Sequence, residues 1–340
     1  MKMRATWMLS VLVSTLATGC VLGPESDDAS RFREAIPRAE AVEVAGPDSA
    51  TQASGTQSFD HMSSAQANEP WADGPWAYWY GFTRHVRTGV NKVTASVLGS
   101  VWIVVHTKPT RVDNDTATWG PFSDSLSPAE YRFVVTEVGD RHYEYKLEGR
   151  AKSEGASAAF VSVLQGEGWG KGHPSHGFGY FEINLDNARA LDPFEIDAED
   201  TGVVRIDHDL PNTITTDLFK GKRTVIATVT PSQSQQRWTA ESVTEESGEG
   251  TLDVTAHVDV DDSKATLLED VTVGSRWNTS GAGRADITVT AGDVPAEIGT
   301  VKATECWNSS FQSVYQGYSH NVTWAVSEGD ASACVFGEPG

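Results

Sequence analysis

The sequence predicts a mainly β protein: a large antiparallel curved sheet, arranged as a half-barrel, a barrel or a sandwich, with one amphipathic helix packed on it. Short runs rich in β-branched and aromatic residues recur from about residue 100 onward, many alternate polar with apolar residues, and Gly, Asp and Ser separate them. Such alternation gives a strand one covered face and one solvated face. Successive short strands joined by turns indicate a meander, a sandwich or a barrel and not an α/β fold.

One helix is expected ahead of most strands, between Gly74-Pro75 and Gly99. Pro75 suits its first turn and Gly99 its exit. The run 101–106 is rich in β-branched residues and is expected to be a strand, so the helix would lead directly into the sheet and pack over it. Apolar residues at spacings of three and four form the stripe that predicts the helix: Trp79, Phe82, Val86, Val90, Val93 and Val97.

A hairpin over residues 131–147 is the clearest pair of strands. It is predicted to comprise strands 131–138 and 141–147, with Gly139-Asp140 at the turn. Further strands are predicted at 158–165, 178–185, 202–208, 224–230, 237–243, 251–260, 265–273, 284–290, 301–306 and 321–326.

The N-terminus indicates export. Lys2 and Arg4 precede a short apolar run, and the small residues Ala17-Thr18-Gly19 precede Cys20, as in a secretory signal. This arrangement resembles the lipobox of bacterial lipoproteins. The resemblance implies a signal peptide over 1–19, fatty acids such as palmitate on Cys20, and, because Val21 is not an aspartate, an outer-membrane location with either face possible. The alternatives are an ordinary secretory signal or an uncleaved anchor, but the apolar run is shorter than the roughly 20 residues that span a bilayer.

Two regions follow the signal. Residues 20–70 are dominated by small, polar and acidic residues and are interpreted as the acylated cysteine and a disordered tether, with a propeptide or a docking arm as the alternative. Ten of the eleven tryptophans lie from Trp71 onward, so residues 71–340 are expected to form a single β-rich globular domain.

Cys306 and Cys334 are an even pair in an exported chain, where oxidation is permitted. We expect them to form a disulfide, with two buried free thiols as the alternative. On the chain-entropy model such a bond stabilises the fold by roughly 3–4 kcal/mol.

The charge distribution limits the partners. A formal net charge of −21 argues against nucleic acid, since phosphate contacts need clustered Lys and Arg. The exception is segment 74–112, which has no acidic residue. It could rest on anionic lipid headgroups, but we favour charges paired with carboxylates of the same domain, because the apolar stripe is needed to cover the sheet. Its basic residues are Arg84, Arg87, Lys92, Lys108 and Arg111.

Signals of catalysis are weak, and no catalytic residue or cofactor is assigned. His173 and His176 could meet a transition metal if their glycine-rich loop turned inward, but a solvated hairpin loop is the simpler interpretation, so no metal is expected. Asp207 and Asp209 can share one face of a strand, whereas His208 points to the other. The chain has neither a Gly-x-Ser-x-Gly nor a Walker loop.

Three scattered patches of residues 71–340 carry a resemblance. They are Gly177-Phe178-Gly179-Tyr180-Phe181-Glu182-Ile183-Asn184 with the following 185–190, residues 283–289, and Glu305-Cys306-Trp307-Asn308-Ser309-Ser310-Phe311. In these patches the chain resembles predicted lipoproteins of myxobacteria. The resemblance implies export and lineage and transfers no catalytic residue.

Three functions remain open. The preferred one is a non-enzymatic lipoprotein, anchored to the outer membrane through its lipid, which binds an apolar or lipid-like ligand or a protein partner on the sheet. The alternatives are a glycan-directed envelope hydrolase that uses carboxylates and a surface adhesion or assembly component recognised along an edge strand. The first predicts a continuous apolar cavity if the ligand is lipid-like, the second a polar cleft with carboxylates of displaced pKa, and the third neither.

Overall fold

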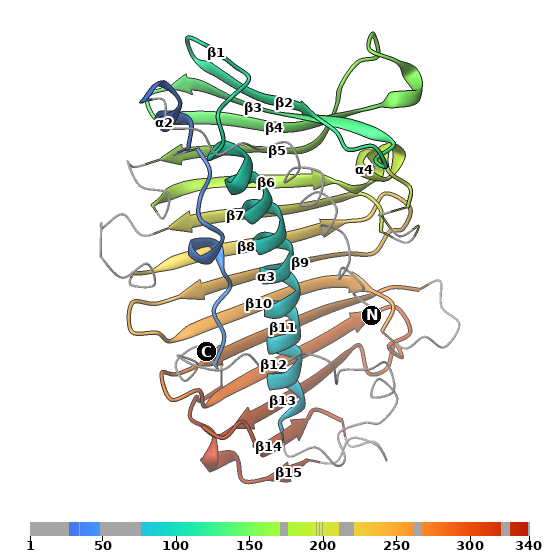
Figure 1. Ribbon diagram of the computed structural model, residues 1–340. Coiled ribbons are helices and arrows are strands. Elements are labelled where there is room, and N and C mark those ends of the chain that lie inside the picture. The colour runs from blue at the N-terminus through green and yellow to red at the C-terminus, as the bar shows by residue number, and fades with distance from the viewer. Residues whose placement is uncertain are drawn as a thin grey trace. The chain divides into compact units, whose positions relative to one another are not determined.

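The computed structural model describes residues 27–33, 35–47, 76–170, 176–194, 196, 198, 200–210, 221–260, 267–320 and 327–338. Within these ranges, fifteen antiparallel strands follow one another in chain order, from β1 to β15, in one open sheet, and α3 is the one long helix (Figure 1). The predicted mainly β class is therefore confirmed. Among the described strands, β1 and β15 end the order of hydrogen-bonded neighbours, so these strands form an open sheet and not a closed barrel.

The chain divides into two compact units. Unit 1 comprises residues 1–44 and 89–239, and unit 2 comprises residues 45–88 and 240–340. The boundaries therefore fall inside α3 (Tyr78–Val105) and inside β9 (Arg237–Thr244).

Unit 1 holds strands β1 to β8, which pair as antiparallel neighbours. The bounds are β1 Arg111–Asp113, β2 Thr116–Phe122, β3 Ala129–Gly139, β4 His142–Ala151, β5 Val161–Gly170, β6 Gly177–Asn184, β7 Val203–Leu210 and β8 Arg223–Thr230. Short helices accompany them: α2 Asp27–Arg33, η1 Ala39–Val42, η3 Lys152–Glu154 and α4 Leu185–Leu191.

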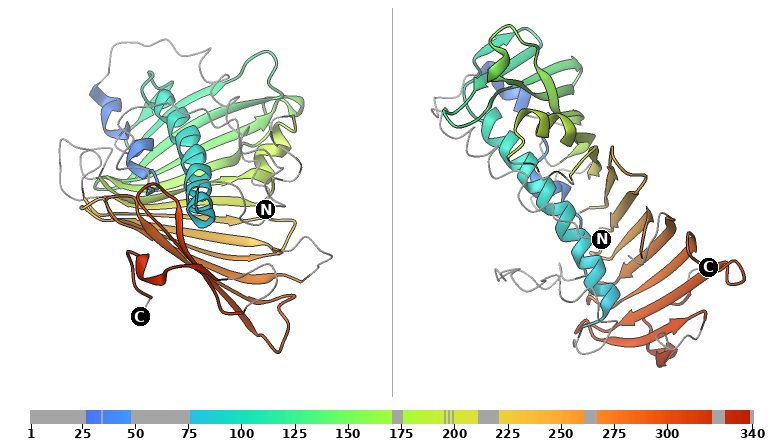
Figure 2. Two further views of the ribbon diagram at one scale, coloured as in Figure 1. Left: turned by 90° about the horizontal axis from the view of Figure 1, so that it is seen from below. Right: turned by 90° about the vertical axis from the view of Figure 1, so that its right-hand side faces the viewer.

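The core of unit 1 lies between its part of α3 and one face of these strands (Figure 2). The indole N–H of Trp119 donates to the Thr107 carbonyl oxygen at 3.1 Å, which ties β2 to the chain leaving α3. Side chains that alternate along the strands fill this face, among them Trp119, Phe133, Tyr145, Phe181 and Ile206, each at most 1% exposed.

Unit 2 holds strands β10 Gly250–Val258, β11 Glu269–Trp277, β12 Gly283–Ala291, β13 Thr300–Trp307, β14 Ser313–Tyr318 and β15 Glu328–Gly329, followed by η4 Ala331–Ala333. The first turns of α3 pack on the core face of these strands. Thr83 Oγ1 lies 2.7 Å from Ser275 Oγ on β11, and the ring of Tyr80 stacks on that of Phe311 at 4.3 Å.

Helix α3 is longer than predicted, and the strand expected at 101–106 is wrong. Val101, Val104 and Val105 are buried and continue the apolar stripe that runs through Val97, while Gly99 lies inside the helix and is not its exit. The preference of β-branched residues for strands is weak, and packing of a continuous apolar stripe overrides it.

By length and composition, α3 is the one helix in the described ranges that could cross a membrane. Of its most apolar window of 18 residues, 44% is buried inside the protein. A core helix that packs on a sheet can have the same length and composition as a membrane-spanning helix. The contact between Thr83 of α3 and Ser275 of β11 is a contact between helix and sheet.

Part of the region interpreted as a tether is docked instead. Phe32, Ile36 and Val42 are fully buried in unit 1. The Asn91 side chain of α3 accepts from the Val44 backbone N–H at 2.7 Å and donates to its carbonyl oxygen at 3.0 Å. Residues 35–44 therefore form a docking arm, which was the alternative to a disordered tether. The composition of this region favours a tether, but a few buried apolar residues are enough to anchor the arm.

Most other strand predictions match to within a few residues. The hairpin is confirmed as β3 and β4, although Gly139 ends β3 and the turn residues are Asp140 and Arg141, the latter at φ 52°. The strand predicted at 321–326 lies outside the described residues. No prediction from the sequence covers α2, β1, β2, β14, β15 or α4. The first turn of α4 is capped by Asn184, whose side chain accepts from the Asn187 N–H.

Candidate functional site

The face of unit 1 opposite its core carries interacting polar side chains in cross-strand rows. We call this the polar face; it is the side of β3 to β8 that carries Arg132, Gln165, Glu182, Arg205 and Thr228. Directly opposed residues are close enough to interact in an antiparallel sheet. Arg132 pairs with Glu148 at 2.8 Å, and Arg150 pairs with Glu130 at 2.5 Å, in both cases across β3 and β4.

Three rings form a stack across β4, β5 and β6 on this face. Trp169 lies 4.2 Å from His142 and 4.8 Å from Phe178, with interplanar angles of 15° and 16°. These residues are direct register partners. Since Trp169 covers one side of the Phe178 ring, the other side is directed toward β7, and Phe178 is 43% exposed.

The next residue row places a guanidinium on an aromatic ring. Arg205 lies 3.6 Å from the centre of the Tyr180 ring and donates to both carboxylate oxygens of Asp207, at 2.8 and 2.6 Å. It also pairs with Glu182 at 3.5 Å. The hydrogen bonds to Asp207 are the main cause that raises the pKa of Arg205, so the charged form of the guanidinium is favoured here.

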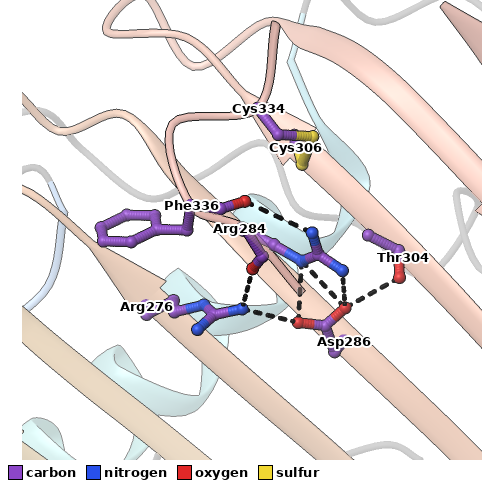
Figure 3. Close-up of polar contacts among 8 residues, drawn as sticks. Arg276, Arg284, Asp286, Thr304, Cys306, Cys334 and Phe336 are labelled. Carbon is purple, nitrogen blue, oxygen red and sulfur yellow. Dashed lines mark hydrogen bonds and ion pairs between the residues drawn. A yellow bond between two sulfur atoms is a disulfide. The ribbon is translucent and has the colours of Figure 1, made fainter. Parts of the chain in front are cut away.

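A second polar cluster lies in unit 2, on the face of the strands opposite α3. Asp286 on β12 accepts from Arg284 Nη2 at 2.7 Å, from Arg276 Nη2 at 3.3 Å and from Thr304 Oγ1 at 2.8 Å. Figure 3 shows both guanidinium groups converging on this carboxylate. Because Arg284 is buried, the carboxylate compensates a charge that would otherwise be costly to bury.

The C-terminal segment is attached to this cluster. Cys306 and Cys334 form the predicted disulfide, with an S–S distance of 2.08 Å. Beyond it, Arg284 donates to the Phe336 carbonyl oxygen at 3.3 Å and Arg276 to that of Gly337 at 2.6 Å (Figure 3). The cluster thus attaches the C-terminal segment to β11 and β12. The guanidinium groups of Arg276 and Arg284 donate to that segment and to Asp286.

The comparisons with known proteins add no relative. No family model, curated protein or solved structure matches this chain. The geometry of these two clusters is therefore the basis for any statement about function.

The candidate residues from the sequence are placed as follows. Cys20 and His173 lie outside the described residues. His176 is buried just before β6, and within the described ranges no group of three or more His, Cys, Asp or Glu side chains could hold a metal ion.

Carboxylates suited to hydrolysis would be expected to have displaced pKa values. Among the described acids whose pKa is shifted, Asp253 has a raised value, caused first by burial and then by Glu241, while Arg276 opposes the shift. Asp330 has a lowered value because it accepts hydrogen bonds from Ser332. One acid with a raised pKa does not make the pair of carboxylates that the hydrolase interpretation requires.

The residues that define the polar face are not among the candidates that the sequence indicates. Asp207 and Asp209 were correctly expected to share a strand face, and both do, but Arg205 and the ring stack were not singled out. Alternation indicates which residues share a face of one strand. It does not tell which residues of two neighbouring strands lie opposite each other, so the rows could not be found.

Proposed function

We propose that this chain is a lipid-anchored lipoprotein of the bacterial outer membrane that works by binding, and that the polar face of unit 1 binds a protein partner. The anchor rests on the lipobox at Cys20. One observation carries the binding function: Trp169, Tyr180 and Arg205, the residue types that dominate the energetics of protein interfaces, are gathered in adjacent rows of one sheet face.

A protein partner is favoured over a lipid-like ligand by the distribution of side chains. The large apolar side chains Trp119, Phe133 and Phe181 of unit 1 are fully buried on the core face. The polar face offers ion pairs and ring edges instead, which suits a wet, mixed protein interface rather than an acyl chain.

The binding function is tested with a photo-crosslinking residue in cells of the source bacterium. It is placed at Ile226, on the polar face of β8 opposite Asp207, and, as a matched control, at Ala95, which is exposed on α3. We expect one discrete protein adduct from Ile226, none of the same mass from Ala95, and loss of the adduct in Arg205→Glu. The same adducts from both positions, or none, would contradict the proposal, as would a copurifying lipid in native mass spectrometry whose binding is unchanged in Arg205→Glu.

The anchor is tested separately. Cys20→Ser is expected to block processing of the signal and to move the protein out of the outer-membrane fraction. Unchanged processing and fractionation would refute the anchor and would leave the binding face untouched.

A further inference from the structure

The polar face of unit 1 contains a complete guanidinium-binding arrangement made from its own residues. Its parts are an aromatic ring on β6, the aspartate directly opposite on β7, and an arginine that stacks on the ring while donating to the aspartate. Tyr180, Asp207 and Arg205 supply these parts, and Tyr180 and Asp207 are direct register partners. The planar guanidinium suits both contacts at once.

The first two parts of this arrangement recur two residues along the same strands. Phe178 on β6 lies directly opposite Asp209 on β7. The alternation of side chains puts both on the polar face, and both are exposed. The position that corresponds to Arg205, two residues before the aspartate, is Asp207, so β7 itself supplies no cation here.

The surroundings of Phe178 and Asp209 favour a positive charge. Within the part of the chain that the structure describes, no side-chain hydrogen bond or ion pair engages the carboxylate of Asp209, whose backbone pairs with β6 and β8. Arg205 is bonded to Asp207, and His142 to Glu167 at 2.5 Å, so these two basic side chains of the polar face already have acidic partners. Trp169 stacks on one side of the Phe178 ring, so the side that a guanidinium could contact is the one directed toward Asp209.

We propose that Phe178 and Asp209 receive an arginine side chain of the protein partner, whose guanidinium stacks on the ring and pairs with the carboxylate. This inference rests on the proposed function and names the chemistry of its contact. The partner presents an exposed arginine and not a lysine. The ammonium of lysine lacks the flat surface and the paired donors that the Arg205 guanidinium uses in the neighbouring row.

The test uses the full chain purified in detergent and two probe peptides, acetyl-Gly-Ser-Arg-Ser-Gly-amide and its citrulline twin, which keeps the shape and loses the charge. Dissociation constants are measured by saturation-transfer NMR. We expect the arginine peptide to bind at least fivefold more tightly than the citrulline peptide. Its binding should weaken at least fivefold in Asp209→Asn and in Phe178→Leu.

Phe178→Tyr keeps a ring and should retain binding. Asp115→Asn and Phe194→Leu change exposed residues of the same types elsewhere in unit 1 and should also leave it unchanged. Equal binding of the two peptides, or full binding by Asp209→Asn, would overturn the inference.

The two proposals fail in distinguishable ways. If the adduct at Ile226 forms and Asp209→Asn leaves it unchanged, the arginine contact is wrong and the binding function stands. If the arginine peptide binds as expected but no protein adduct forms at Ile226, the protein partner is wrong and the guanidinium contact stands.

Discussion

The carboxylate of Glu305 on β13 accepts the backbone N–H of Trp79 at 2.7 Å, so an acid from the sheet caps the first turn of α3. Glu305 is 1% exposed, and its other oxygen accepts from Gln316 at 2.9 Å. The N-terminus of a helix has unpaired N–H groups and a partial positive charge, which together stabilise a buried carboxylate. The helix is thereby fixed at its start to the strands of unit 2.

Glu305→Gln should lower the free energy of unfolding by about 1–3 kcal/mol, because the substitution removes the charge from hydrogen bonds that a carboxylate makes more strongly. Urea denaturation followed by circular dichroism measures the loss. The control is Glu297→Gln, an exposed position at which we expect a change within about 0.5 kcal/mol. Equal stability of the two variants would show that the capping hydrogen bond contributes nothing.

The Asp286 cluster is a second place where one substitution should be costly. Asp286→Asn leaves the buried Arg284 without its carboxylate, and we expect a loss of about 3 kcal/mol of stability. Asp270→Asn on the neighbouring strand is the control, because that side chain is 60% exposed and its pair with His257 should be worth less than about 1 kcal/mol. Losses of equal size in the two denaturation curves would mean that burial of Arg284 does not matter.

The local features of the fold could be predicted, and the contacts between distant segments could not. The strand predicted at 284–290 is β12, Gly283–Ala291, because alternation along one strand directly reflects one covered face. The disulfide could be predicted from an even pair of cysteines in a chain whose N-terminus indicates export. The predicted end of α3 at Gly99 is wrong because the valines that follow are compatible with a helix or a strand. Their packing on the sheet stabilises the helix as far as Val105.

The candidate site depends on register, which a single sequence does not contain. Phe178 and Asp209 lie opposite each other only because β6 pairs with β7 across α4 and the chain that follows it. A shift of one residue would move Asp209 to the core face. The hydrogen bond from the Trp79 N–H to Glu305 cannot be predicted from the sequence either, since 226 residues separate the two.

His208 should make the stability of the protein depend on pH. It is buried on the core face of β7, and burial lowers its pKa to about 4, although the charge of Asp207 acts in the opposite direction. The unfolded chain binds the proton with a pKa near the ordinary value of 6.5. Full stability is therefore present above pH 6.5, falls as the pH drops from 6.5 to 4, and then levels off for this residue, with a total loss of about 3 kcal/mol.

The measurement is the free energy of unfolding in urea at several pH values from 7.5 to 4. His208→Leu should flatten the curve in this range, whereas His320→Gln, at an exposed position, should keep the slope of the parent protein. An unchanged slope in His208→Leu would assign the pH dependence to other groups.

Two glycine-to-alanine substitutions should have opposite effects. Gly166 lies directly opposite Tyr145, whose ring covers it, so that a Cβ at Gly166 would come within 2.3 Å of the ring. The ring cannot easily move away, because the Tyr145 hydroxyl donates to the Tyr180 carbonyl oxygen at 3.1 Å. Gly166→Ala should therefore destabilise the protein by about 1–3 kcal/mol.

Gly99 lies in α3 with nothing within 4 Å of an added Cβ, so Gly99→Ala should stabilise the protein by about 0.5–1 kcal/mol through the better helix propensity of alanine. Thermal unfolding of both variants decides the matter, since a shift of the same sign in both would show that the ring over Gly166 is not what requires glycine there.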